Sequence, residues 1–150
     1  MANFFLDTSA FVKRYHPEPG TDRVLALFNQ PQNRIQISRL TLVEVRSAFA
    51  VKVRTREIDQ PTAAALWIQL LSDVAAGVFE VLPITDTHYQ LAEQLLGQYA
   101  FQSRLRTLDA LQLAVALERN EQAAIDGFVL ADQALSEVAI AERLPAILLA

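Results

Sequence analysis

Four acidic side chains, Asp7, Glu44, Asp109 and Asp132, occupy positions from which carboxylates can hold a divalent cation. Asp7 and Asp132 each follow a short apolar run typical of a β-strand, and Glu44 and Asp109 fall in the first turns of predicted helices. Carboxylate oxygens are the ligands that Mg²⁺ and Mn²⁺ prefer. Crowded carboxylates repel and raise one another's pKa, so a cluster of four indicates a bound cation.

Each of these acids also has a local structural role open to it. Thr41 and Glu44 have the spacing of a capping box, in which the glutamate accepts from the threonine amide. Asp7 and Asp132 can act as helix N-caps, and Asp109 can complement a helix dipole. Taken one position at a time, capping competes with metal binding.

The elements that must position the acids follow from the apolar pattern. Short apolar runs predict strands at 3–6, 35–37, 79–82, 128–130 and, as an edge strand, 147–149. Helical spacing and capping residues predict helices from Ala10 to about Tyr15 and at 21–29, 41–56, 61–76, 85–99, 107–119 and 132–140. This alternation predicts one α/β domain over 1–150, a three-layer α/β/α sandwich around a mainly parallel sheet of four to five strands. Sites in such sheets lie beyond the carboxyl ends of the strands, so the acids are expected to meet at one edge.

Composition excludes several kinds of site. The 150 residues are 52% hydrophobic, enough to bury a sizeable core, and contain no cysteine, which rules out disulfides, thiolate zinc sites and cysteine nucleophiles. His16 and His88 are isolated and give no basis for a triad or a zinc site. The first residues lack a basic leader and a spanning apolar run, so we expect no membrane association and a cytoplasmic location.

Basic residues are concentrated in one segment. The net charge of −4 argues against broad adhesion to nucleic acid. Six Lys or Arg side chains nevertheless lie between Arg34 and Arg56, opposed only by Glu44, whereas 57–103 contains none. This segment is either a solvated helix face or a surface that contacts phosphates. The candidates for contact with a nucleic acid near the acids are Arg39, Arg46 and Arg104.

The amino-acid sequence around the four acids resembles the motifs of PIN-domain proteins. The first motif runs from Asp7-Thr-Ser-Ala-Phe to Gly20, and the second is Leu40-Thr-Leu-Val-Glu44. The third is Arg106-Thr-Leu-Asp109-Ala-Leu-Gln-Leu-Ala, and the fourth is Phe128-Val-Leu-Ala-Asp132. In these motifs the sequence is similar to VapC-type toxins of bacterial toxin–antitoxin pairs. One position departs from the pattern, because Leu130 stands where the family usually has a hydroxyl residue.

The resemblance implies roles for these residues. Asp7, Glu44 and Asp109 would hold Mg²⁺, and Asp132 either completes a second metal position or acts through water. Thr8 and Ser9 would hold a carboxylate or bound water by hydrogen bonds, with helix capping as the alternative.

The resemblance also implies a small ribonuclease that is often dimeric, an RNA substrate and a cognate antitoxin. We expect single-stranded or looped RNA, an antitoxin peptide that presents a basic side chain to the carboxylates, and an isologous homodimer formed through the apolar hairpin 41–76. A PIN-like module without turnover is an alternative, which Leu130 favours. A receiver or nucleotide-binding domain is disfavoured because the four glycines form no phosphate-binding motif and no second acid flanks Asp7.

Overall fold

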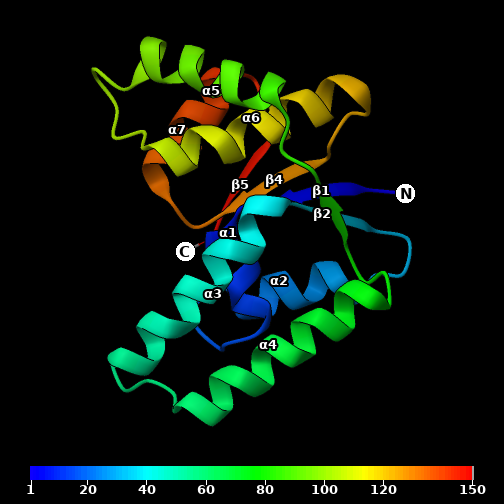
Figure 1. Cartoon of the computed structure of the whole chain (residues 1–150). Coiled ribbons are helices and arrows are strands. Elements are labelled where there is room, and N and C mark those ends of the chain that lie inside the picture. The colour runs from blue at the N-terminus through cyan, green and yellow to red at the C-terminus, as the bar shows by residue number, and fades with distance from the viewer. Residues whose placement is uncertain (150) are drawn as a thin grey trace.

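The computed structural model describes residues 1–149 and contains a five-stranded, all-parallel sheet between two layers of helices (Figure 1). The strand order is β3-β2-β1-β4-β5. The strands are β1 (Asn3–Leu6), β2 (Arg34–Ser38), β3 (Glu80–Leu82), β4 (Gly127–Leu130) and β5 (Ala146–Leu148). The predicted sandwich and its strands are confirmed, including the edge position of the last strand.

The helices divide between the two faces of the sheet (Figure 1). One layer holds α1 (Thr8–Phe11) with the short 3₁₀ helix Val12–Arg14, α2 (Thr21–Phe28), α3 (Arg39–Arg54) and α4 (Gln60–Ala75). The other holds α5 (Asp86–Tyr99), α6 (Thr107–Gln122) and α7 (Gln133–Ala141). Within residues 1–149, no helix combines the length and apolar character needed to cross a membrane.

Burial on both faces explains why the strands are continuous apolar runs. In β1, Phe5 packs into the core beneath α5–α7, whereas the next residue, Leu6, packs into the core beneath α1–α4. Phe128 and Val129 of β4 divide in the same way. Successive side chains of a strand point to opposite faces, so a strand covered on both sides needs apolar residues at every position.

Helix α3 begins earlier than its capping signal predicted. It starts at Arg39, with Ser38 as the N-cap residue, so Thr41 lies inside the first turn. The predicted capping box of Thr41 and Glu44 is therefore wrong. The Thr41 hydroxyl instead meets side chains from distant parts of the chain.

The start of one other helix also differs from the prediction. Helix α1 begins at Thr8, and its N-cap is the carboxylate of Asp7, which accepts from the Ser9 amide. Neither Thr8 nor Ser9 caps the helix, because their hydroxyls bind carboxylates instead. Helix α6 begins at Thr107, the predicted start, but its N-cap residue is Arg106.

Glu18 links the segment after α1 to the far half of α3. Its Oε1 accepts from Lys13 Nζ and its Oε2 from Lys52 Nζ, each at 3.3 Å, and both lysines are buried. Burial alone would raise the pKa of Glu18, but the hydrogen bonds and charges of the two lysines hold it below its ordinary value. The folded state therefore favours the ionised carboxylate.

Glu18→Gln is expected to destabilise the protein near pH 7 by about 2 kcal/mol, since two buried ammonium groups lose their counter-charge while Glu18 keeps some solvent contact. A carboxyl with a lowered pKa contributes stability above its unfolded pKa and loses it as pH falls through the folded pKa. The difference in the free energy of unfolding between variant and wild type should therefore disappear at acidic pH. Urea unfolding measures it, with exposed Glu93→Gln as control. Equal stability of Glu18→Gln and wild type at neutral pH would contradict this.

Candidate metal centre

Asp7 is held at the carboxyl end of β1 by contacts that also involve β4. It is only 6% exposed, and its Oδ2 accepts from the Ser9 amide at 3.1 Å and from Ser9 Oγ at 2.6 Å. Ser9 Oγ also accepts from the Ala131 amide at 2.9 Å, directly after β4. The Ser9 hydroxyl therefore fixes the Asp7 carboxylate relative to two neighbouring strands.

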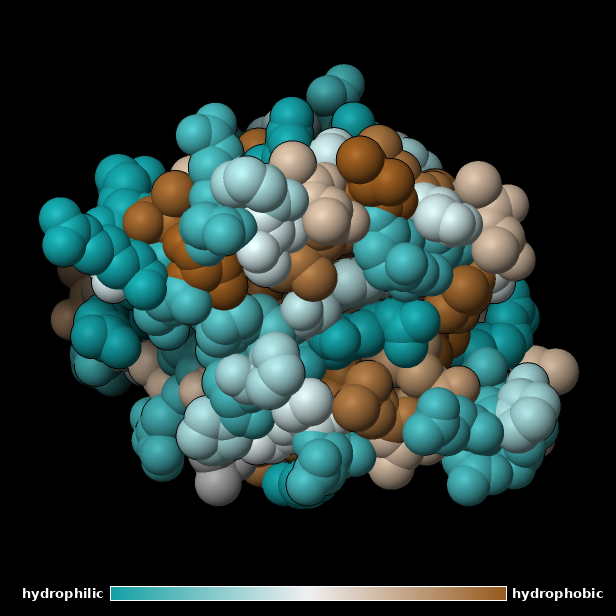
Figure 2. Space-filling view, turned by 90° about the horizontal axis from the view of Figure 1, so that it is seen from below, coloured by the Kyte–Doolittle hydropathy of each residue, from teal (hydrophilic) through white to brown (hydrophobic). Residues whose placement is uncertain are grey.

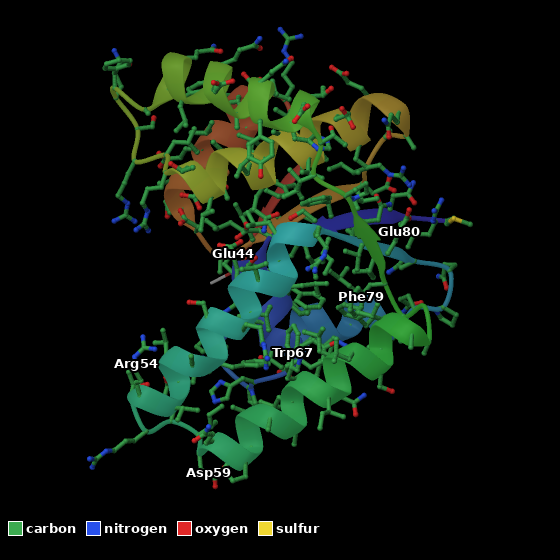
Figure 3. All side chains as sticks on the ribbon, viewed as in Figure 1. Glu44, Arg54, Asp59, Trp67, Phe79 and Glu80 are labelled. Atoms are coloured by element: carbon green, nitrogen blue, oxygen red, sulfur yellow. The ribbon has the colours of Figure 1, made fainter. Side chains whose placement is uncertain are left out.

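Glu44 is held by a buried polar network. Its Oε1 accepts from Thr8 Oγ1 at 2.7 Å and from Gln112 Nε2 at 2.9 Å. The Gln112 amide also lies 2.8 Å from Thr41 Oγ1, and its own Oε1 accepts from Ser38 Oγ at 2.8 Å. The network joins α1, α3 and α6. In Figure 3, Glu44 lies near the start of α3, between the two groups of helices.

Sequence reasoning missed Gln112, which is 1% exposed. The signal was present, because Gln112 follows Asp109 by three residues and so lies on the same side of α6. It is flanked by the buried apolar residues Leu111 and Leu113. A polar side chain inside an apolar helix needs a partner, and here the partners are polar groups around Glu44.

Asp109 and Asp132 are half-buried and stand at the starts of α6 and α7. Oδ2 of Asp109 accepts from the Arg106 amide at 3.3 Å. Oδ1 of Asp132 accepts from the Leu135 amide at 3.0 Å and caps its helix. The predicted N-cap role of Asp132 is confirmed, and Asp109 lies in the first turn as its predicted dipole role requires, but each contact uses only one oxygen.

In all four acids, the two oxygens of the carboxylate have different surroundings. One oxygen of each carboxylate is held by protein donors, and among the described residues no hydrogen bond reaches the other. The oxygens left open are Asp7 Oδ1, Glu44 Oε2, Asp109 Oδ1 and Asp132 Oδ2. Such a set supplies hard anionic donors on side chains that are each anchored through one oxygen, which fits Mg²⁺ or Mn²⁺ by type of ligand.

The charges of the four acids act on one another in pairs. Burial raises the pKa of Asp7 to about 6, partly opposed by the Ser9 hydrogen bonds and reinforced by the charges of Glu44 and Asp109. Burial also raises the pKa of Asp109, opposed by the Arg106 amide and reinforced by the charges of Asp132 and Glu44. The acids lie close enough to repel one another, and a cation would relieve that repulsion.

The side chains do not yet form a coordination shell. As they stand, residues 1–149 contain no group of three or more His, Asp or Glu side chains arranged to hold a metal ion. Glu44, Asp109 and Asp132 are only partly buried, so their open oxygens have room to turn. The residues present fit a divalent cation by chemistry, with side-chain rotation needed to enclose it.

A groove of about 600 Å³ gives access to two of the acids. Its lining includes Glu44 and Asp109, and the remaining lining residues are Leu96, Leu105, Arg106, Thr107 and Leu108. The groove thus combines anionic groups, an apolar wall and one arginine.

The family model of the PIN domain matches residues 4–141, a span that includes all four acids. The chain belongs to the PIN-domain family. This confirms the resemblance seen in the motifs. A comparison with curated proteins found no match.

Solved structures share this PIN fold over nearly the whole chain. FitAcB from Neisseria gonorrhoeae aligns with a TM-score of 0.67 at 16% identity, covering 96% of each chain. VapC20 from Mycobacterium tuberculosis, described as a sarcin–ricin loop cleaving toxin, aligns with a TM-score of 0.63 at 17% identity, covering 89% of this chain and 93% of that one. VapBC-5 from the same organism, a member of a family of toxin–antitoxin systems, aligns with a TM-score of 0.61 at 21% identity, covering 99% of this chain and 98% of that one. Identities this low show the fold alone.

Leu130 of this PIN domain is fully buried in the core beneath α5–α7 and brings no polar group to the acids. A hydroxyl is present beside the fourth motif all the same. It belongs to Ser9, whose Oγ accepts from the Ala131 amide and donates to Asp7.

The exposed arginines lie in different places around this PIN domain. The Arg46 guanidinium stacks 4.4 Å from the centre of the Trp67 ring and lines a second groove, between α3 and α4, that contains none of the four acids. Trp67 is labelled in Figure 3 on the side of α4 that faces α3. Arg106, which sequence reasoning did not select, lines the acidic groove, and its charge lowers the pKa of Asp109.

Proposed function

We propose that this PIN domain is a divalent-metal-dependent endoribonuclease of the VapC toxin type, a hydrolase of RNA phosphodiester bonds. The observation that carries the proposal is the convergence of four carboxylates, each with one oxygen held by the protein and one left open. Membership of a family composed generally of nucleases supports it. So does a fold shared with VapC20, which is described as cleaving the sarcin–ricin loop.

The residues would act as follows. Asp7, Glu44 and Asp109 would hold Mg²⁺ or Mn²⁺, with Asp132 at a second metal position or holding water. The bound cation supplies charge neutralisation for phosphate oxygens and lowers the pKa of the attacking water. Ser9, Thr8 and Gln112 keep the carboxylates oriented before substrate arrives.

RNA would enter through the groove beside Glu44 and Asp109. The Arg106 guanidinium, on the groove wall, would offset charge that develops on the scissile phosphate. Attack of water on phosphorus then breaks one P–O bond of the backbone, and the leaving oxygen takes up a proton. Arg39 and Arg104, both exposed, are candidates for contacts with neighbouring phosphates.

The test compares wild type with Asp109→Asn on total RNA in Mg²⁺ or Mn²⁺, with sequencing of the new ends. Asparagine can still accept from the Arg106 amide but loses the charge, so we expect the fold to persist and cleavage to fall by on the order of a hundredfold or more. Asp86→Asn is the matched control, because Asp86 also lies in the first turn of a helix but is exposed.

A PIN-like module that binds without turnover is the second candidate. The lack of a ready coordination shell and the apolar Leu130 in the fourth motif favour it. Saturable Mg²⁺ binding with no RNA cleavage across metals and substrates would support this candidate and exclude the nuclease.

An antitoxin partner is part of the proposal. Similar structures include VapBC complexes of toxin–antitoxin systems. The groove between α3 and α4, of about 470 Å³, is lined mainly by apolar groups such as Phe49, Ala50 and Val53, and suits an amphipathic helix. From there, a basic side chain of the antitoxin would extend to the carboxylates and replace the charge of the cation.

Ala50→Glu is expected to prevent the complex with the small protein encoded next to this chain, because it places a charge in the apolar groove. Size-exclusion chromatography of the coexpressed pair measures this. Ser47→Glu, on an exposed position of α3 outside that groove, is the matched control. A complex that survives Ala50→Glu would contradict the docking site.

We also propose an isologous homodimer. Large apolar side chains are exposed on α3 and α4, namely Val43, Val51, Ile68 and Leu71. Figure 2 views the molecule from below, where apolar residues surface in several separate patches among polar ones. A dimer would cover part of this surface. Sedimentation that detects only monomer at micromolar concentration would contradict it.

A further inference from the structure

Phe101 exposes its ring next to the acidic groove. It lies in the loop 100–106 between α5 and α6 and is 89% exposed, the most exposed large hydrophobic side chain among the described residues. A single exposed aromatic is common on protein surfaces and by itself indicates nothing. For Phe101, the neighbouring groove and arginines suggest a function.

An apolar surface connects Phe101 to the carboxylates. Phe101 lines a shallow depression of about 310 Å³ together with Leu96, Gly97 and Ala100. Leu96 also lines the groove that contains Glu44 and Asp109. The two hollows therefore adjoin at Leu96, and a chain whose phosphate lies at the acids can extend a neighbouring base toward the Phe101 ring.

The charge of the same loop is complementary to a nucleic acid. Arg104 and Arg106 are both exposed, and no Asp or Glu occurs between Glu93 and Asp109. Within the described part of the chain, neither arginine forms an ion pair. The loop thus offers two cations beside an open aromatic ring.

An aromatic ring with adjacent arginines is a platform for single-stranded nucleic acid, because unpaired bases stack on the ring while the arginines contact phosphates. We infer that Phe101, Leu96 and Arg106 form a subsite for one unpaired nucleobase next to the scissile phosphate of an RNA strand. This rests on the proposed ribonuclease function and adds a preference to it. RNA that presents an extruded base at that position binds best, and a continuous duplex binds poorly.

The test uses the Asp7→Asn background with Mg²⁺, so that RNA is bound without being cut. A fluorescent purine analogue is moved one position at a time along a short single-stranded oligoribonucleotide. Stacking should quench the analogue at one position. Phe101→Ala should abolish that quenching and weaken binding about tenfold, since stacking on an aromatic side chain contributes on that scale.

Two further variants sharpen the result. Phe101→Trp keeps a stacking surface and should retain both quenching and affinity. Tyr89→Ala removes an exposed aromatic side chain of α5 that lines neither hollow, and should change neither the quenching nor the RNA affinity. An abasic nucleotide at the quenched position should weaken binding to wild-type Phe101 and add little to the loss already caused by Phe101→Ala.

Unchanged RNA affinity in Phe101→Ala overturns the inference. If the same variant also converts a dimer to a monomer, the patch is instead a contact between copies of this chain. Failure of the proposed function is distinguishable, because it appears as absence of cleavage by the unmodified protein. Normal cleavage by Phe101→Ala would contradict only the inferred base subsite and would leave the proposed ribonuclease function standing.

Discussion

Asp7→Asn is expected to stabilise the folded protein near pH 8 while abolishing RNA cleavage. Asp7 is 6% exposed, and burial raises its pKa from 3.8 to about 6. Because the folded pKa lies above the unfolded one, the stability linked to this group is complete below pH 3.8 and is lost as pH rises through about 6. At alkaline pH the folded state thus contains an unfavourable buried charge, costing about 3 kcal/mol.

Asparagine removes that charge and can still accept hydrogen bonds from Ser9. Urea unfolding near pH 8 should therefore show the variant to be more stable by about 2 kcal/mol, with a smaller difference near pH 5. Cleavage should fall by on the order of a thousandfold, since a carboxylate proposed to hold the cation is lost. Asp86→Asn is the control for a change of net charge on the surface.

Mg²⁺ provides a readout that does not depend on RNA. A cation that binds only the folded state raises its stability, so Mg²⁺ should shift the unfolding midpoint of wild type upward and leave Asp7→Asn nearly unchanged. Equal stabilisation of both proteins would show that Asp7 is not a ligand. A variant less stable than wild type near pH 8 would show that the buried carboxylate is neutralised by some other group.

Gln112→Leu is expected to reduce both stability and activity. The Gln112 amide lies within hydrogen-bond distance of Glu44, Thr41 and Thr8 oxygens and accepts from Ser38. Leucine has a similar volume but leaves the buried Ser38 hydroxyl without an acceptor and removes one donor from Thr41, so the free energy of unfolding should fall by about 3 kcal/mol. Glu44 would keep only the Thr8 donor, and cleavage should fall roughly 10- to 100-fold, with weaker apparent affinity for Mg²⁺.

The matched control is Gln122→Leu, the same substitution at an exposed position near the end of α6. Unfolding curves and Mg²⁺ titrations of cleavage separate the two effects. A folded Gln112→Leu protein with wild-type metal dependence would show that the network supports the core but does not position Glu44. Gln112→Glu should be worse than leucine, because it places a second carboxylate beside Glu44.

The strands and layers could be predicted because burial on both sides leaves a direct trace in the sequence. Phe5 and Leu6 point to opposite cores, so β1 had to be an uninterrupted apolar run. The four acids could be found because they stand where strands end and helices begin, and because the surrounding motifs resemble those of PIN domains.

Two contacts that the local sequence could not predict depend on partners far away in the chain. Thr41 looks like a helix cap in its local sequence, yet its hydroxyl meets Thr8 and Gln112, 33 and 71 positions away. Similarly, Arg46 lies in the basic segment, but Trp67 on the next helix holds its guanidinium in a separate groove. No pattern of spacing contains these pairings, because they arise only once the layers have packed.

The four acids come from four different elements: Asp7 follows β1, Glu44 lies in α3, Asp109 in α6, and Asp132 precedes α7. A ribosome must therefore synthesise the chain through Asp132 before all four can meet. A nascent or truncated chain that ends before Asp132 lacks a complete centre even if its first layer has folded. Under the proposed function, the ribonuclease activity cannot begin while Asp132 is still to be synthesised.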